Sequence, residues 1–191
     1  NPNIIIVIGG AHATMNGESV FEHKEIDISC IGEGEVTIVE LLKALESGKS
    51  LNTVNGIMFR DENNKITKTS PRAYIDDLDT LAHPFTYAKK TLKDFDRYPK
   101  EAFSNVFASR GCPYACTFCE SKAMWTRKVR YRSPQNIIEE LKQLRDFGLK
   151  RVSFEDDTFG VSKKNIKAIN DLMHQEVPDM TYMCETVVQL A

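Results

Sequence analysis

The chain has 191 residues, a formal net charge of -2 and ordinary apolar and charged fractions. This composition predicts a soluble globular chain that is long enough to bury a core. The near-neutral charge gives no electrostatic indication of a nucleic-acid partner, and no apolar run approaches the roughly twenty residues that a membrane span needs.

Residues 1–50 alternate strand and helix patterns. Ile4–Ile8 is a continuous apolar run, typical of a buried parallel strand, and it enters a tight turn at Gly9 and Gly10. The patterns after this turn predict a short helix over Glu18–Lys24, a strand over Ile26–Ile31, and a helix from Glu35 to Gly48 whose apolar face carries Ile38, Leu41, Leu42 and Leu45. This order predicts the last part of a doubly wound α/β sheet.

Residues 51–103 read as a connector. Gly56–Arg60 and Lys65–Thr69 flank an Asn-rich turn, which predicts a β-hairpin. The rest of the segment carries several prolines and many aromatic residues. Because flexible linkers rarely carry so many aromatics, we expect this segment to pack on its neighbours.

Residues 104–191 resume the alternation. The patterns predict a strand at Asn105–Ala108, a helix capped by Ser133 and ending at Gly148, a strand at Arg151–Phe154, a helix capped by Ser162, and a strand starting at Met180. Such a repeat builds a parallel barrel or part of one, with functional loops after the carboxyl ends of the strands.

Three cysteines follow the first of these strands, at Cys112, Cys116 and Cys119. Soft thiolates select zinc, copper(I) or iron–sulfur clusters. A structural zinc site is normally closed by four ligands, yet Cys30 and Cys184 are distant and predicted to be ordinary buried cysteines. An odd number of cysteines argues against disulfides. The spacing favours a cluster with one open coordination position, with structural zinc as the alternative.

The run Gly111-Cys-Pro-Tyr-Ala-Cys-Thr-Phe-Cys119, with Ala-Ser-Arg leading into it, resembles the cluster loop of radical S-adenosylmethionine enzymes. The resemblance implies that S-adenosylmethionine chelates the fourth iron of a 4Fe–4S cluster and is cleaved to a 5'-deoxyadenosyl radical. It places the aromatic Phe118 at the cofactor, and it implies that the other three irons are held by Cys112, Cys116 and Cys119.

The same resemblance implies a flavodoxin or ferredoxin as reductant, a small-molecule substrate and a cytoplasmic, oxygen-poor setting. No side chain is predicted to act as a catalytic acid, base or nucleophile.

Glu155, Asp156 and Asp157 directly follow a predicted strand. Three adjacent carboxylates repel one another electrostatically unless a cation or a hydrogen-bond donor pairs with them. The run resembles the acidic stretch at the end of the second strand in the same family, although it reads Glu-Asp-Asp in place of Gly-Gly-Glu. The resemblance implies contact with the ammonium or ribose of S-adenosylmethionine, through Asp156 or Asp157 by strand alternation. The alternative is a solvated turn that caps the next helix.

The basic run Trp125–Arg132 has two interpretations. It is either a solvated loop whose side-chain stems pack on the barrel, or a clamp near an anionic cluster and the cofactor carboxylate. Arg110 is a candidate for the clamp because it lies two residues before Cys112.

A second resemblance lies in the first segment. Gly9-Gly-Ala-His-Ala-Thr14, followed by Gly32-Glu-Gly-Glu35, is similar to the latter half of the cobalamin-binding domain of one radical S-adenosylmethionine subgroup. It implies that Gly9 and Gly10 allow close approach of the cobalamin tail. The cobalt-ligating Asp-x-His-x-x-Gly motif does not occur in the chain, so His12 is not predicted to ligate cobalt.

Together these patterns predict an α/β fragment: the C-terminal part of a Rossmann-like cobalamin-binding domain (1–50), a β-hairpin connector (51–103) and the N-terminal part of a partial (β/α)6 barrel (104–191). Asn1 and Ala191 look like cut ends, so the fragment is expected to be inactive alone. The predicted function is cobalamin-dependent methyl transfer. The alternatives are a porphyrin-cyclase-like oxidation or ring closure, a radical enzyme without cobalamin, an inert scaffold, and a non-catalytic iron–sulfur or zinc module.

Overall fold

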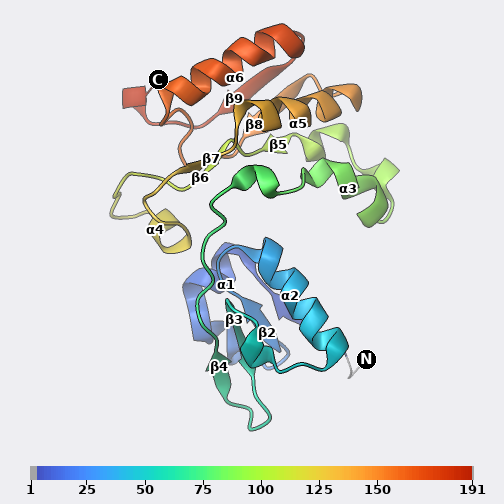
Figure 1. Cartoon of the computed structure of the whole chain (residues 1–191), viewed down its shortest axis with the longest axis vertical. Coiled ribbons are helices and arrows are strands. Elements are labelled where there is room, and N and C mark those ends of the chain that lie inside the picture. Colours follow the sequence, from blue (N-terminus) through green and yellow to red (C-terminus); the bar gives the residue numbers. More distant parts are fainter. Residues whose placement is uncertain (1–3, 191) are drawn as a thin grey trace. The chain divides into compact units, whose positions relative to one another are not determined.

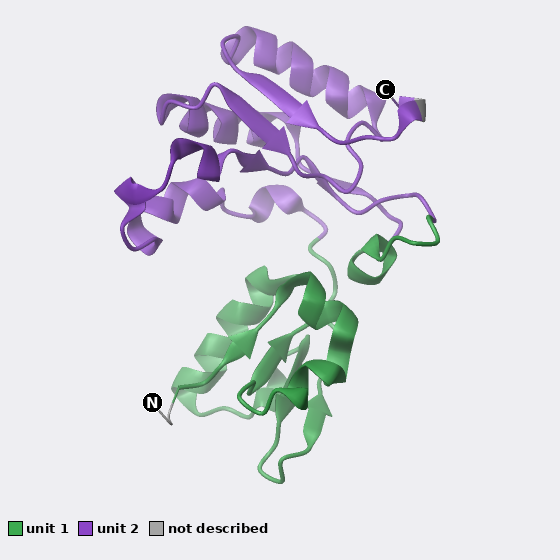
Figure 2. Cartoon of the chain, turned by 180° about the vertical axis from the view of Figure 1, so that it is seen from behind, with its two compact units in different colours: residues 1–75, 116–125 green, residues 76–115, 126–191 purple. Residues whose placement is uncertain are grey.

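The structure is a computed structural model that describes residues 4–190 (Figure 1). Asn1 and Ala191 lie outside the described residues. The chain divides into two compact units, residues 1–75 with 116–125 and residues 76–115 with 126–191 (Figure 2). The division therefore crosses the cysteine run between Ala115 and Cys116. Among the described residues, no helix is long and apolar enough to cross a membrane.

The first unit is built on a mixed sheet in the order β1-β2-β3-β4, with strands at Val7–Ile8, Ile28–Cys30, Ile57–Arg60 and Ile66–Lys68. β1 runs parallel to β2, and the other pairs are antiparallel. The helices of this unit are α1 (Gly10–Asn16), α2 (Gly34–Ser47) and α4 (Ser121–Met124). The predicted hairpin forms as β3 and β4, but it continues the first sheet because β3 pairs with β2.

Two predictions of burial in the first unit are wrong. Ile4, Ile5 and Ile6 are exposed, because β1 lies at an edge of the sheet and a buried parallel strand needs cover on both faces. In α2 the buried face is centred on Leu41, which is fully buried, whereas Leu42 is 52% exposed. Both residues fit an apolar helix pattern, so periodicity alone did not set the boundary of the buried stripe.

The second unit contains a parallel sheet in the order β5-β8-β9, with strands at Asn105–Val106, Arg151–Phe154 and Thr181–Cys184. A short antiparallel pair, β6 (Ser109–Arg110) and β7 (Arg130–Tyr131), lies in the same unit. Its helices are α3 (Pro84–Thr91), α5 (Pro134–Asp146) and α6 (Lys163–Glu176). The predicted caps are confirmed: the hydroxyls of Ser133 and Ser162 each accept a backbone N–H at 3.2 Å.

Short 3-10 helices connect these elements, at Gly17–Glu22 (η1), Leu51–Thr53 (η2), Leu78–Thr80 (η3), Phe95–Arg97 (η4), Lys100–Phe103 (η5) and Val188–Leu190 (η6). The helix predicted over residues 18–24 is thus a 3-10 helix that begins and ends earlier. α3 lies in the predicted connector, where no helix was expected.

The core of the second unit fixes the strands that precede the candidate site. α5 packs against α6 along one side of the sheet (Figure 1), and Ile137, Leu141 and Leu144 of α5 are almost fully buried. Val106 and Phe154, the last residues of β5 and β8, belong to the same core. Burying each such side chain contributes roughly 1.5–3 kcal/mol, so both strand ends are firmly held.

Candidate functional site

The chain leaves β5 and β8 at the same edge of the parallel sheet. Val106 is paired with Phe154 in the strand register, and the backbone N–H of Glu155 donates to the carbonyl of Val106 at 2.9 Å. Residues after the carboxyl ends of adjacent parallel strands are neighbours, and ligands bind outside such edges. The segment that leads to Cys112 therefore lies beside the acidic run.

Asp156 holds this segment. Its side chain is buried, Oδ1 accepts the N–H of Ala108 at 2.7 Å, and Oδ2 accepts the hydroxyl of Ser109 at 2.5 Å. Burial raises the pKa of Asp156 to about 6, and the hydrogen bonds from Ser109 and Ala108 partly oppose that shift. Both carboxylate oxygens thus bond to the chain that precedes the cysteines.

Two further contacts continue this series of contacts, called the ladder below, toward the first cysteine. The N–H of Gly111 donates to Oδ2 of Asp157 at 3.3 Å, and Sγ of Cys112 lies 3.3 Å from Oγ1 of Thr158. Thr158 did not stand out in the sequence. The sequence feature that could have identified it is its position directly after the three carboxylates. The register of β5 and β8 places the residues that follow β8 beside the cysteine segment.

Gly111 allows this close approach. Its φ is +102°, and an added Cβ would lie 2.9 Å from the carbonyl oxygen of Lys128 and 3.2 Å from that of Thr126. Side chains other than hydrogen are disfavoured at such a φ, and backbone carbonyls cannot move aside easily. The residue before Cys112 is therefore required to be glycine.

Cys116 and Cys119 belong to the first unit and are both exposed. The N–H of Cys119 donates to the carbonyl of Cys116 at 3.2 Å, and Sγ of Cys119 accepts the N–H of Ser121 at 3.5 Å. Phe118 is 89% exposed. Accessible thiols with a backbone donor nearby fit a soft metal centre.

The other cysteines differ from these. Cys30 is buried and Cys184 is half-buried, and burial raises the pKa of both thiols. Such groups remain neutral thiols near neutral pH and behave as small apolar side chains, as predicted.

Within residues 4–190, no group of three or more His, Cys, Asp or Glu side chains is arranged to hold a metal ion. Cys112 belongs to one unit, and Cys116 and Cys119 belong to the other. The ligand set thus stays a prediction from spacing. The donor chemistry nevertheless fits an iron–sulfur cluster, since three thiols from one loop are the donors that such clusters take.

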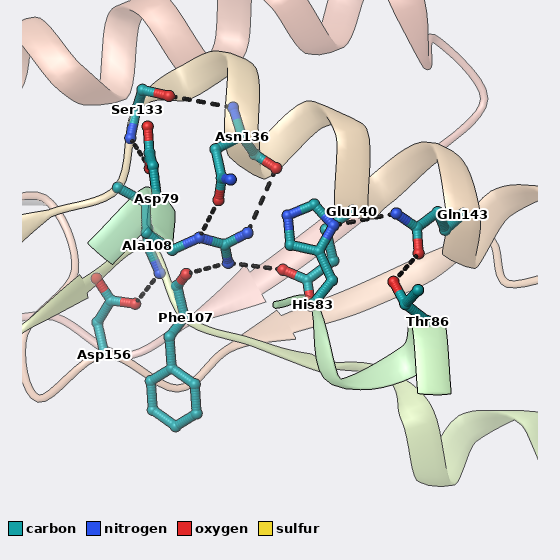
Figure 3. Close-up of polar contacts among 11 residues, drawn as sticks. Asp79, His83, Thr86, Phe107, Ala108, Ser133, Asn136, Glu140, Gln143 and Asp156 are labelled. Carbon is teal, nitrogen blue, oxygen red and sulfur yellow. Dashed lines mark hydrogen bonds and ion pairs between the residues drawn. The ribbon is translucent and has the colours of Figure 1, made fainter. Parts of the chain in front are cut away.

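The last residue of the basic run has a structural role. Arg132 donates to Oδ1 of Asn136, to the carbonyl of Phe107 and to Oε2 of Glu140, at 2.7, 2.7 and 2.6 Å. The Arg132 and Glu140 side chains are only 11% and 5% exposed. Figure 3 shows these partners converging between α5 and the segment after β5. Arg132 therefore anchors the cysteine-bearing segment to a helix and does not act as an exposed clamp.

The Gly-Gly segment forms a second candidate region, within the first unit. Gly10 has a φ of +86°, and an added Cβ would meet nothing within 4 Å, so open space lies in front of it. Oγ1 of Thr14 donates to the carbonyl of Gly10 at 2.8 Å and accepts the N–H of Gly32 at 3.0 Å. Thr14 thereby joins the two motifs of the second resemblance.

A cavity of about 260 Å³ lies beside this junction and is lined in part by Thr14, Gly32 and Tyr74. The buried Glu33, also in its lining, accepts the N–H of Ile75 at 2.7 Å. His12 lies apart from that lining, with Nδ1 3.2 Å from the side-chain amide of Asn16. The structure thus gives His12 a local partner on its own helix.

Parts of this chain are similar to known proteins and to a known family. Residues 106–189 match the Radical SAM superfamily model. An uncharacterized methyltransferase, PH0819, of Pyrococcus horikoshii is 34% identical over 192 residues, covering 98% of this chain and 41% of the relative. The anaerobic magnesium-protoporphyrin IX monomethyl ester cyclase of Synechocystis sp. is 34% identical over 164 residues, covering 85% of this chain and 32% of the cyclase.

A solved structure has the same fold. The cobalamin-dependent S-adenosylmethionine radical enzyme OxsB, with aqua-cobalamin and S-adenosylmethionine bound, matches with a TM-score of 0.73 at 21% identity, over 93% of this chain and 25% of OxsB. The chain thus spans less than half the length of these proteins. The cysteine motif and the family match agree: residues 106–189 of this chain belong to the Radical SAM superfamily.

Proposed function

We propose that Cys112, Cys116 and Cys119 ligate three irons of a 4Fe–4S cluster and that S-adenosylmethionine binds the fourth iron. Enzymes of the superfamily use both cofactors. When bound, this pair supplies one-electron cleavage of the sulfonium and a 5'-deoxyadenosyl radical. The remaining work belongs to the protein: it holds the thiols in place, orients the cofactor and keeps water away.

The observation that carries the proposal is the ladder between the acidic run and the cysteine segment. Asp156, Asp157 and Thr158 bond in succession to Ala108, Gly111 and Cys112. A side chain that ligates a metal must be held in one orientation. Hydrogen bonds from surrounding groups provide this, because they orient the ligand and tune the metal. A solvated acidic turn would not require it.

S-adenosylmethionine carries an ammonium and ribose hydroxyls, which carboxylates recognise. We assign this contact to Asp157, with Glu155 as a second acceptor, since Asp156 uses both oxygens to hold Ala108 and Ser109. Phe118, with 89% of its surface exposed, supplies an apolar surface for the bound cofactor.

We further propose that the first unit is the C-terminal part of a Rossmann-like cobalamin-binding domain and the second the start of a partial (β/α)6 barrel. The open space in front of Gly10 fits a bound tail of cobalamin. Cobalamin-dependent methyl transfer from methylcobalamin is then the favoured reaction. Radical oxidation or ring closure is the second candidate, because the cyclase relative has the same 34% identity as the methyltransferase relative, over 85% and 98% of this chain respectively. A flavodoxin or ferredoxin supplies the electron.

The test is anaerobic reconstitution of the chain with iron and sulfide, followed by electron paramagnetic resonance of the reduced protein. We expect the spectrum to change when S-adenosylmethionine is added, because the cofactor binds the open iron. Alanine at Cys112, Cys116 or Cys119 is expected to abolish the signal. For the longer protein that would carry a whole cobalamin-binding domain, growth with cobalamin is expected to leave a corrin absorption spectrum on the purified protein.

Cys30→Ala and Cys184→Ala are the matched controls, since each removes a thiol that burial keeps neutral. Both are expected to load a cluster as the wild-type chain does. A spectrum that does not respond to S-adenosylmethionine, or a cluster that persists without Cys112, contradicts the proposed site. Loading with zinc alone supports the non-catalytic module in its place.

A further inference from the structure

The side chain of Thr158 lies against Cys112, with Oγ1 3.3 Å from Sγ. We propose that the Thr158 hydroxyl donates a hydrogen bond to the cluster-bound sulfur of Cys112 and raises the reduction potential of the cluster. This inference rests on the proposed function, since it requires Cys112 to be a cluster ligand.

The direction of the hydrogen bond follows from counting protons. A threonine hydroxyl has one proton and two lone pairs. Oγ1 of Thr158 also lies 2.7 Å from the carbonyl of Asp157, so with a Cys112 thiol the S–H donates to Oγ1 and the hydroxyl donates to that carbonyl. A metal-bound thiolate has no proton to give, so the contact persists favourably only if Thr158 turns its proton to the sulfur.

The relative strengths of the two acceptors favour this turn. A hydrogen bond to an ionised acceptor is roughly twice as strong as one to a neutral carbonyl. Thr158 is only 5% exposed, so it has little contact with bulk water, and the low local dielectric strengthens the interaction. If the proton stayed on the carbonyl of Asp157, two lone-pair-bearing atoms would face each other at van der Waals distance.

The segment around Thr158 is fixed from its other side, so the hydroxyl does not drift from the sulfur. The N–H of Phe159 donates to the carbonyl of Glu185 at 3.0 Å, and the hydroxyl of Thr186 donates to the carbonyl of Phe159 at 2.6 Å. Phe159 is itself buried against Phe154, with ring centroids 4.8 Å apart. The geometry at Thr158 is thus set by β8 and by the end of β9 together.

The consequence is electrostatic. Reduction adds negative charge to an iron–sulfur cluster, and hydrogen bonds to the sulfurs are among the features that set its potential. A donor at the Cys112 sulfur stabilises the reduced state more than the oxidised one. Thr158 therefore makes the cluster easier to reduce and a weaker reductant than the same cluster without this hydroxyl.

The experiment compares reduction potentials of the anaerobically reconstituted chain, measured by dye-mediated titration and electron paramagnetic resonance without S-adenosylmethionine. Thr158→Val keeps the shape and removes the hydroxyl, so its midpoint is expected to shift to a more negative potential. The midpoint of Thr158→Ala should shift in the same direction. Thr158→Ser keeps a hydroxyl and should have the wild-type midpoint. Thr181→Val is the matched control and should not change it, because the Thr181 hydroxyl donates to the carbonyl of Lys150 at the opposite end of β8 and β9.

The outcomes separate this inference from the proposed function. A wild-type chain that binds no cluster, or one that keeps its cluster in Cys112→Ala, overturns both. A wild-type cluster whose midpoint is unchanged in Thr158→Val and Thr158→Ala overturns the hydrogen bond alone. If the midpoint of Thr158→Ser is as negative as that of Thr158→Ala, the hydrogen bond is also refuted, since the effect would then come from packing and not from the hydroxyl.

Discussion

Asp156 gives the second unit a pH-dependent stability that its sequence position alone does not reveal. The carboxyl is 7% exposed, and burial raises its pKa from 3.8 to about 6. Because one pKa unit corresponds to about 1.4 kcal/mol, the shift represents a difference of about 3 kcal/mol between protonation states. Asp156→Asn removes the titration and keeps an oxygen for the Ala108 N–H.

The sign follows from proton linkage. Between pH 3.8 and about 6 the folded chain retains a proton on Asp156 that the unfolded chain has released. The free energy of unfolding therefore falls as pH rises through this window. The contribution is fully present below pH 3.8 and is lost above about pH 6, so Asp156 stabilises the folded state least when it is ionised.

The assay is urea unfolding of wild type and Asp156→Asn at several pH values, followed by circular dichroism. The wild-type free energy of unfolding, taken relative to the variant, is expected to fall by about 2 kcal/mol between pH 4 and pH 7. Glu155→Gln removes an exposed carboxylate of the same run and should retain the wild-type decline. A difference between wild type and Asp156→Asn that is constant with pH would refute the reasoning.

Two further substitutions probe the support of the cysteine segment. Gly111→Ala forces a side chain against the carbonyl of Lys128, so it is expected to lower the free energy of unfolding by about 1–3 kcal/mol and to reduce iron uptake. Gly148 has a similar φ, but a methyl group there has only the end of a lysine side chain to displace. Gly148→Ala should therefore load iron normally. Equal iron uptake by the two variants would contradict this. Glu140→Gln leaves Arg132 buried with an unpaired charge, so thermal unfolding should show a loss of about 3–5 kcal/mol, and the double change to Met at both positions should recover much of it.

Local patterns predicted the second unit well because its signals are short in sequence. Ser133 and Ser162 cap their helices through residues three positions later, and β8 occupies the predicted span Arg151–Phe154. Ile137, Leu141 and Leu144 recur at helical spacing within α5, and all three are buried. Each of these features is determined by residues within one element.

The errors arose where a distant partner decides the outcome. The apolar run at Ile4–Ile8 predicted a buried strand, but burial depends on what lies on either side of it. The basic run allowed either a packed solvated loop or a clamp, and only the contact with Glu140 of α5 assigns Arg132 a structural role. Strand alternation left Asp156 and Asp157 equivalent, and only the register of β5 against β8 assigns Asp156 to Ala108 and Ser109.

The division of labour within the acidic run bears on how mutations of this site are interpreted. Asp156 bonds the chain three and four residues before Cys112, so its loss would displace a cysteine without removing any contact to a cofactor. Asp157 bonds Gly111 through one oxygen, so its loss would affect both the loop and any bound ligand. Reduced iron uptake in an Asp156 variant is therefore no evidence that Asp156 touches S-adenosylmethionine. A ligand role requires that a variant load its cluster normally and still bind S-adenosylmethionine more weakly. We expect that separation for Asp157→Asn, which removes the charge and keeps an oxygen for the Gly111 N–H.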